Sequence, residues 1–234
     1  MKKLLLTAAV ALAAAPAFAS ETIVQWTFEG DTLVPNVALT GIPSISLTDG
    51  ITSTFAGGYP GGGSDVGGTL GRGYNIIPFA GLTVPITPTN PEPKTRWIEF
   101  FAPTTGYLNI QVSYAHRFSN TAPNTAVFQY NAGSGWMDFA SYTVSKGDRW
   151  WFQEFDLSGI AEVNDNAALA FRVTPDVDVT GGYSAARDTS TIGNSGTWRF
   201  DDFTVTGTVV PEPASLIALG AGVAGLAGFA RRRS

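Results

Sequence analysis

The chain has 234 residues, of which 14% are charged, and its formal net charge is −5 at pH 7. It contains no cysteine and one histidine, which excludes disulfides, thiol catalysis and metal sites built from several histidines. Residues 20–209 carry 9 basic and 18 acidic residues, and this acidic balance argues against nucleic acid as a partner.

The first 19 residues have the pattern of a secretory signal peptide. Two lysines follow Met1, residues 4–15 form an apolar run, and Ala17 and Ala19 form a small-residue cleavage signal. The apolar run is too short for a permanent membrane span. We therefore predict export by Sec-type machinery and cleavage between Ala19 and Ser20.

Residues 20–209 have the composition of an all-β domain. Short runs of Val, Ile, Thr and aromatic residues alternate with clusters of Gly, Pro, Asn and Asp. Between Leu108 and Tyr114 every second residue is apolar, as in a strand with one buried face. About nine such runs predict a two-sheet, jelly-roll-like β-sandwich. The predicted strands are 22–28, 81–86, 96–101, 106–115, 125–130, 137–144, 150–156, 167–174 and 197–207.

Three long loops are predicted between these strands. Residues 57–73 contain nine glycines, residues 83–94 contain four prolines, and residues 181–196 are rich in Ser, Thr and Gly. Loops of this length in a compact domain are often functional. A glycine-containing hairpin loop is predicted at 131–135, and a helical turn at 157–163.

Catalytic residues are scarce. His116 is the one histidine, no G-x-S-x-G motif accompanies it, and we expect it on the surface or in a loop. Glu99, Glu154 and Asp156 lie on predicted strands and could support glycoside hydrolysis if two of them faced each other across a cleft. The sequence favours a protein that is not an enzyme.

Two segments at the ends of the body resemble a known family. Trp-Thr-Phe-Glu-Gly-Asp at 26–31 and Trp-Arg-Phe-Asp-Asp-Phe-Thr-Val at 198–205 resemble the first and last strands of jelly-roll carbohydrate-binding modules of the galactose-binding-like kind. In that family the two segments meet around a structural calcium. The resemblance implies that Glu29 and Asp201 supply carboxylates and that backbone carbonyls, with Asp31 or Asp202, complete the shell. The alternative is that Asp201 and Asp202 only flank a strand.

Aromatic side chains are the predicted route to glycan binding, because flat rings stack on the apolar faces of sugars. The candidates are Trp136 at the hairpin, Tyr59 and Tyr74 in the glycine-rich loop, and Tyr183 in the third loop. Residues 127–136, 150–157 and 168–173 also resemble, in order and pattern, strands of extracellular adhesion-type jelly rolls. On a regular strand the adjacent Trp150 and Trp151 point to opposite faces, so one is expected in the core.

The carboxyl end has a separate organisation. Pro211-Glu212-Pro213 precedes 17 uncharged residues, 214–230, and then Arg231, Arg232 and Arg233. As a helix this apolar run would span about 25 Å, enough for a thin hydrocarbon core, with the arginines on the cytoplasmic side. Together these features resemble the PEP-CTERM sorting signal of Gram-negative bacteria, in which an exosortase recognises the tail.

These features divide the chain into a signal peptide (1–19), a β-sandwich (20–209) and a sorting signal with a transmembrane helix (210–234). The precursor is expected in the inner membrane, and the mature protein on the cell surface or in the extracellular matrix. Our leading hypothesis is a non-enzymatic, polysaccharide-associated domain with a structural Ca²⁺. The alternatives are a structural envelope or matrix protein that contacts protein partners without binding glycan, and a secreted glycan-active hydrolase.

Overall fold

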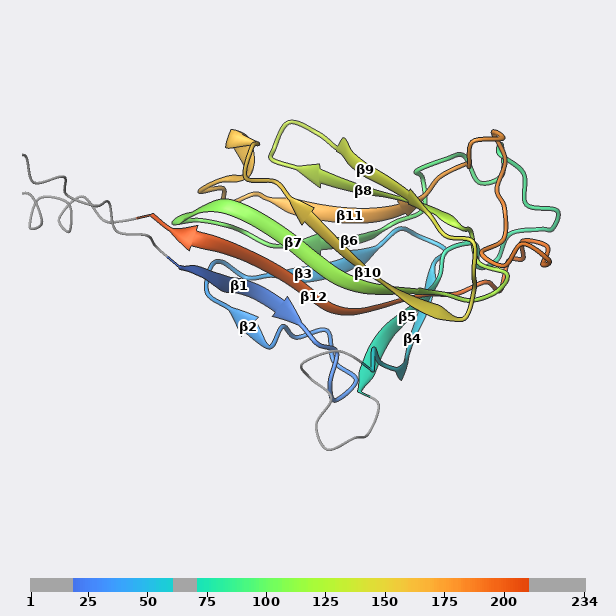
Figure 1. The fold of residues 1–234 in the computed structure, drawn as a ribbon, viewed down its shortest axis with the longest axis horizontal. Helices are drawn as coiled ribbons and strands as arrows, with labels where there is room; N and C mark the ends of the chain where they lie inside the picture. Colours follow the sequence, from blue (N-terminus) through green and yellow to red (C-terminus); the bar gives the residue numbers. More distant parts are fainter. Residues whose placement is uncertain (1–18, 61–70, 211–234) are drawn as a thin grey trace, which may run out of the picture.

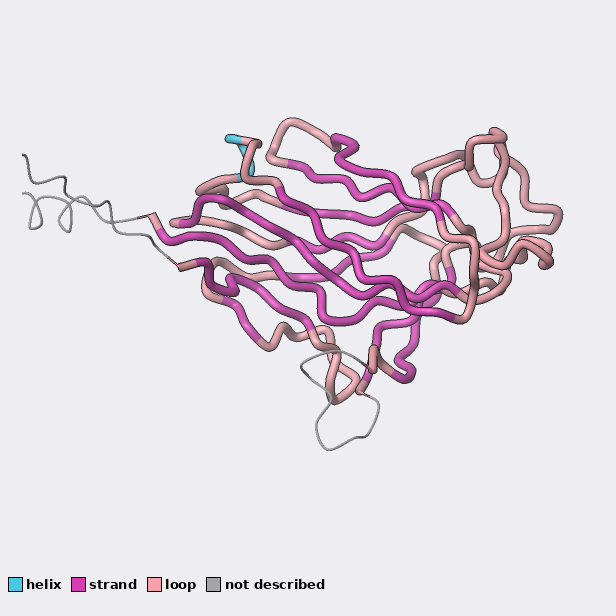
Figure 2. Tube along the Cα trace, in the orientation of Figure 1, coloured by secondary structure: helices cyan, strands magenta, loops and turns pink. Residues whose placement is uncertain are grey.

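The computed structural model describes residues 19–60 and 71–210, which form two antiparallel β-sheets packed as a sandwich (Figures 1 and 2). The first sheet has the order β10-β7-β12-β1-β2, and the β4–β5 hairpin joins it through β12. The second sheet has the order β3-β6-β11-β8-β9. The strands are β1 (Ser20–Trp26), β2 (Val37–Ala38), β3 (Ser44–Leu47), β4 (Thr52–Gly57), β5 (Arg72–Ile77), β6 (Ile98–Phe101), β7 (Tyr107–Phe118), β8 (Thr125–Asn131), β9 (Met137–Thr143), β10 (Arg149–Asp156), β11 (Ala170–Pro175) and β12 (Trp198–Val209).

The all-β sandwich predicted from the sequence is confirmed, and eight of the nine predicted strands overlap an observed strand. The predicted strand at 81–86 is wrong. The N–H groups of Ala80 and Leu82 bond to the carbonyls of Ile77 and Phe79, which closes two consecutive turns. Pro85 also cannot donate to a strand ladder. The observed strands β2, β3, β4 and β5 were not predicted.

The one helical element among the described residues is a 3₁₀ turn, η2 (Ala161–Val163), which confirms the helical turn predicted at 157–163. Within residues 19–60 and 71–210 no helix is long and apolar enough to cross a membrane. The predicted signal peptide before residue 19 and the predicted sorting tail from Pro211 onward lie outside the described residues.

Aromatic side chains from both sheets fill the core. Phe203 on β12 stacks on Phe100 of β6 with ring centroids 3.7 Å apart and an interplanar angle of 6°. Tyr114 on β7 stacks on the same Phe203 at 5.5 Å, and Trp26 on β1 meets it edge-on at 5.9 Å. All four rings are fully buried, so Phe203 links three strands of one sheet to the other sheet.

His116 also lies in this core, and the prediction of a surface position is wrong. Strand β7 continues to Phe118, so His116 follows the inward alternation of Tyr114 and is fully buried. Its ring stacks on Phe200 at 4.3 Å, and its Nδ1 lies 2.8 Å from the hydroxyl of Tyr142. Burial holds the pKa of His116 well below its usual value, so the imidazole packs as a neutral ring.

Candidate functional site

The outward face of the second sheet carries a row of polar side chains that crosses all five strands. In the strand register Ser46 lies opposite Glu99, Glu99 opposite Arg172, Arg172 opposite Gln129, and Gln129 opposite Asp138. The sequence neighbours of these residues on β6 and β11 are buried apolar side chains, so alternation points the polar ones away from the core. We call these five residues the polar row.

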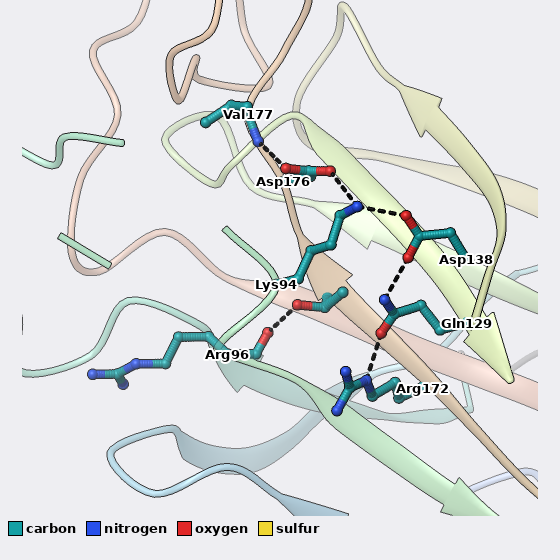
Figure 3. Close-up of polar contacts among 8 residues, drawn as sticks. Lys94, Arg96, Gln129, Asp138, Arg172, Asp176 and Val177 are labelled. Atoms are coloured by element: carbon teal, nitrogen blue, oxygen red, sulfur yellow. Dashed lines mark hydrogen bonds and ion pairs between the residues drawn. The ribbon is translucent and has the colours of Figure 1, made fainter. Parts of the chain in front are cut away.

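Direct contacts join one end of the polar row into a network (Figure 3). Nε of Arg172 donates to Oε1 of Gln129 at 2.5 Å, and Nε2 of Gln129 donates to Oδ1 of Asp138 at 2.5 Å. Nζ of Lys94 lies 2.5 Å from Oδ2 of Asp138 and 3.4 Å from Oδ2 of Asp176. The bond to Asp138 raises the pKa of Lys94, so the network stays ionised at neutral pH.

Arg172 is the centre of the row. Its guanidinium lies over the ring of Trp136 at 4.1 Å and over that of Trp97 at 5.8 Å. Burial raises the pKa of the neighbouring Glu99, while the charge of Arg172 opposes that shift. Among the described residues no ion pair within 4 Å joins Arg172 to Glu99. The site therefore combines a fixed cation, a separate carboxyl group and two tryptophan rings.

The predicted glycan contacts fall in different places. Trp136 lies at the polar row, as described above. Tyr59 lies on the other side of the sandwich, 5.8 Å from Trp150 of β10. The prediction that Tyr74 contacts glycan is wrong. Tyr74 belongs to β5 rather than to a loop, and it stacks on Phe28 in the core with 4% of its surface exposed.

The prediction that Tyr183 offers an exposed ring for sugar stacking is also wrong. It packs edge-on against Phe79 at 5.0 Å in a small second cluster with Ile86, and only 9% of its surface is exposed. The expected opposition of the two adjacent tryptophans is confirmed, since Trp151 packs against the main core while Trp150 faces outward to Tyr59.

The carboxylates considered for hydrolysis do not form a facing pair. Glu99 lies on β6 in the second sheet, whereas Glu154 and Asp156 lie on β10 in the first sheet. Each points out of its own layer, because the alternate positions on both strands face the core. The body of the sandwich therefore separates Glu99 from the other two.

A second cluster of acidic residues lies where the β4–β5 hairpin meets β12. Asp201 is 1% exposed; its Oδ2 accepts the N–H of Tyr59 at 2.7 Å and its Oδ1 that of Asp202 at 2.8 Å. Oε1 of Glu29 accepts the N–H of Arg72 at 2.8 Å. Burial, reinforced by the charges of Asp202 and Glu29, raises the pKa of Asp201 to about 7.

Asp31 and Asp202, the other two predicted metal ligands, have surroundings that differ from those of Glu29 and Asp201. The carboxylate of Asp31 bonds to the side chain of Arg72, at 2.5 Å from Nε and 3.1 Å from Nη2. Asp202 has a positive φ of 49° at the irregularity in β12. No group of three or more His, Cys, Asp or Glu among the described residues could hold a metal ion. Any cation here would therefore depend on Glu29, Asp201 and backbone oxygens.

Comparison with known proteins adds a sequence match at the carboxyl end. Residues 209–234 match the family model described as the PEP-CTERM protein-sorting motif. The chain carries a PEP-CTERM sorting signal. The signal marks an exported protein of Gram-negative bacteria that is sorted by an exosortase and is membrane-anchored before processing. No curated protein matches the chain.

Several solved structures resemble the body of this chain in fold. One is the C-terminal family 22 carbohydrate-binding module of Clostridium thermocellum Xyn10B, with a TM-score of 0.46, 13% identity, and coverage of 81% of this chain and 97% of that one. The N-terminal CBM22-1–GH10 modules of the same enzyme, complexed with xylohexaose, give 0.38 and 13%, covering 72% of this chain and only 28% of that one. The K2 cleaved adhesin domain of Lys-gingipain gives 0.41 and 12%, covering 82% and 100%.

Sequence reasoning missed most of the polar row. Glu99 was considered only as a catalytic carboxylate, and Trp136, which lies beside the row, was singled out because it adjoins a glycine-rich hairpin. Arg172, Gln129, Asp138 and Ser46 were not singled out. A weak signal was present: Glu99 and Arg172 each stand alone between apolar residues, the pattern of an outward position on a strand. That pattern gives the face but not the neighbour across the sheet.

Proposed function

We propose that the body is a non-enzymatic domain that binds extracellular polysaccharide through the polar row. The observation that carries this proposal is the juxtaposition of Arg172, Glu99 and two tryptophan rings on one outward sheet face. Sugars present apolar C–H faces to aromatic rings and hydroxyl groups to charged and amide side chains. The polar row offers both kinds of contact.

The dimensions and rigidity of the row suit an extended glycan. Five strands spaced 4.7–4.9 Å apart place its ends about 19 Å from each other. The Gln129 and Trp136 contacts fix Arg172, so a ligand would not need to order that side chain. Sites built on strands also hold their geometry better than sites on loops.

The two alternatives have less support. Hydrolysis by a carboxylate pair needs two groups about 5–10 Å apart across the ligand, and Glu99 has no such partner among Glu154 and Asp156. A purely structural role without glycan binding leaves an ordered row of charged and aromatic groups without a ligand. If the body bound only protein partners, no polysaccharide binding would be measured.

Replacing Trp136 or Arg172 by alanine is expected to weaken polysaccharide binding about 10–100-fold, the loss of roughly 1.4–2.8 kcal/mol of stacking and hydrogen bonding. The measurement is affinity electrophoresis of the full chain in detergent against a panel of neutral β-linked and acidic polysaccharides. Trp150→Ala, on the opposite sheet, is the matched control and is expected to bind normally. Binding by no polysaccharide, or equal binding by all four proteins, contradicts the proposal.

The sorting signal gives a separate prediction. Replacing Pro211, Glu212 and Pro213 with alanines is expected to leave the precursor in the inner membrane, because the exosortase no longer recognises the tail. The measurement is the ratio of precursor to mature protein in fractionated cells that produce the exosortase. The control changes Arg149 and Lys146, two exposed basic residues on the body, to alanine. Normal maturation of the triple variant counts against exosortase processing.

We further infer that a structural Ca²⁺ is held by the carboxylates of Glu29 and Asp201 together with backbone oxygens. The support is electrostatic: a carboxyl group that is 1% exposed, with two acidic neighbours that raise its pKa, is stabilised by a nearby cation. Asp31 does not belong to this set, because Arg72 neutralises it. The bound cation would join β12, which carries Asp201, to the segment after β1 that carries Glu29.

A further inference from the structure

The segment that contains β2 and β3 has no charged residue. Residues 32–48 lie between Asp31 and Asp49 and contain only apolar, hydroxyl, amide and glycine residues. Several of their apolar side chains face solvent: Ile42 is 86% exposed, Val34 68% and Leu39 53%. A groove of about 520 Å³ runs between these residues, lined mainly by Leu33, Val34, Pro35, Ala38, Ile42 and Pro43. We call this region the apolar surface.

The apolar surface reaches the end of the sandwich from which the sorting tail leaves. Thr40 bonds through its hydroxyl to the carbonyl of Pro103, in the loop between β6 and β7. The same loop contains Gly106, whose carbonyl accepts the N–H of Val210 at 2.8 Å. Val209, directly before it, is also 41% exposed. Figure 1 shows β1, β2 and the end of β12 together at this end.

We propose that the apolar surface rests on the lipid bilayer while the precursor is anchored. The uncharged run of the sorting signal begins at residue 214, four residues after Val210. Four extended residues span at most about 14 Å, so this end of the sandwich must stay close to the membrane. Exposed apolar side chains gain by entering the interface, and the absence of charge means that no ion is desolvated.

The charged residues near the apolar surface predict which lipid headgroups it contacts best. Glu162 and Asp165 are exposed on η2 and next to it, and Asp165 bonds to Gly106 in the loop beside the tail. These carboxylates would be repelled by anionic headgroups. Contact is therefore expected to be closer on zwitterionic than on anionic bilayers.

The absence of cysteine from the chain allows a direct test by single-cysteine labelling. The full chain is reconstituted in phosphatidylcholine vesicles with an environment-sensitive fluorophore at Ile42→Cys or at Val179→Cys. Val179 is fully exposed and lies beyond Pro175, at the opposite end of β11 from the apolar surface. Both labelled chains keep the same sorting tail, so insertion of the tail affects them equally.

The label at position 42 is expected to shift to shorter wavelength, to brighten about two-fold or more, and to be quenched by nitroxide lipids. The label at position 179 is expected to resemble the water-exposed dye. Equal spectra at the two positions overturn the proposal. A shift at position 42 that follows protein concentration rather than lipid also overturns it and assigns the surface to a second copy. Matching melting temperatures of the labelled and unlabelled chains show that labelling leaves the fold intact.

Discussion

Replacing Phe203 by alanine is expected to lower the free energy of unfolding of the body by about 3–5 kcal/mol. The ring is fully buried and contacts Phe100, Tyr114 and Trp26, so its removal leaves a cavity between the two sheets. For a domain of this size the melting temperature falls by about 2–4 °C for each kcal/mol, so a loss of roughly 6–20 °C is expected. Differential scanning calorimetry measures it.

The matched control is Phe152→Ala, the same substitution at a residue that is 55% exposed on β10. This variant is expected to change the free energy of unfolding by no more than about 0.5 kcal/mol. Similar losses of unfolding free energy for both variants would contradict the prediction that the contacts of Phe203 between the two sheets stabilise the fold.

The second large effect is expected at Asp201 and depends on pH and on calcium. In chelator, the folded-state pKa of about 7 lies above the ordinary value near 4, so the folded protein prefers the protonated acid. The resulting stabilisation is complete below pH 4 and is lost as the pH rises through 7, a change of up to roughly 4 kcal/mol. Asp201→Asn, which remains neutral, is expected to lose this pH dependence between pH 4 and pH 8 in chelator.

Calcium is expected to stabilise the unsubstituted chain at pH 8. At a concentration one hundred times Kd, a ligand that binds only the folded state adds about 2.7 kcal/mol, or about 5–11 °C in melting temperature. Asp201→Asn should lose most of this gain, whereas Asp31→Asn should keep it, because Asp31 pairs with Arg72. Thermal unfolding with calcium and with EDTA separates the variants. Identical unfolding curves with and without calcium would contradict the proposal that the body binds a structural Ca²⁺.

His116 provides an internal check on the pH series. Its pKa is lowered by burial, so its contribution to stability is present above pH 6.5 and is lost as the pH falls. This trend opposes that of Asp201 in weakly acidic solution. The Asp201 effect is therefore measured as the difference between the unsubstituted chain and Asp201→Asn at each pH, where the histidine contribution cancels.

The long strands could be predicted from the sequence because their alternation is visible without any partner. Strand β7 shows a regular inward series from Ile110 to Tyr114, and extending that series by two residues would have placed His116 in the core. Leu108, expected on the same face, is 38% exposed, because the strand is irregular at Asn109, which has a positive φ of 55°. Strands β2 to β5 were missed because they are short or lie beside glycine-rich and proline-rich segments. Their strand conformation comes from pairing with β1, β6 and β12 rather than from local preference.

The polar row was harder to predict, because it depends on register between strands that are far apart in the sequence. Glu99, Gln129 and Arg172 become neighbours only through the order β6-β11-β8. The acidic cluster was easier, since Glu29 and Asp201 lie in motifs that a resemblance singles out. The pairing of Asp31 with Arg72 could not be foreseen, because Arg72 comes from a strand that the sequence did not reveal.

Strand β12 is the last strand of the body to be synthesised, yet it lies inside its sheet, between β7 and β1. In a polypeptide that emerges amino end first, the facing edges of β7 and β1 remain without partners until residues 198–209 arrive. The first sheet can therefore be completed only once the last strand of the body is available.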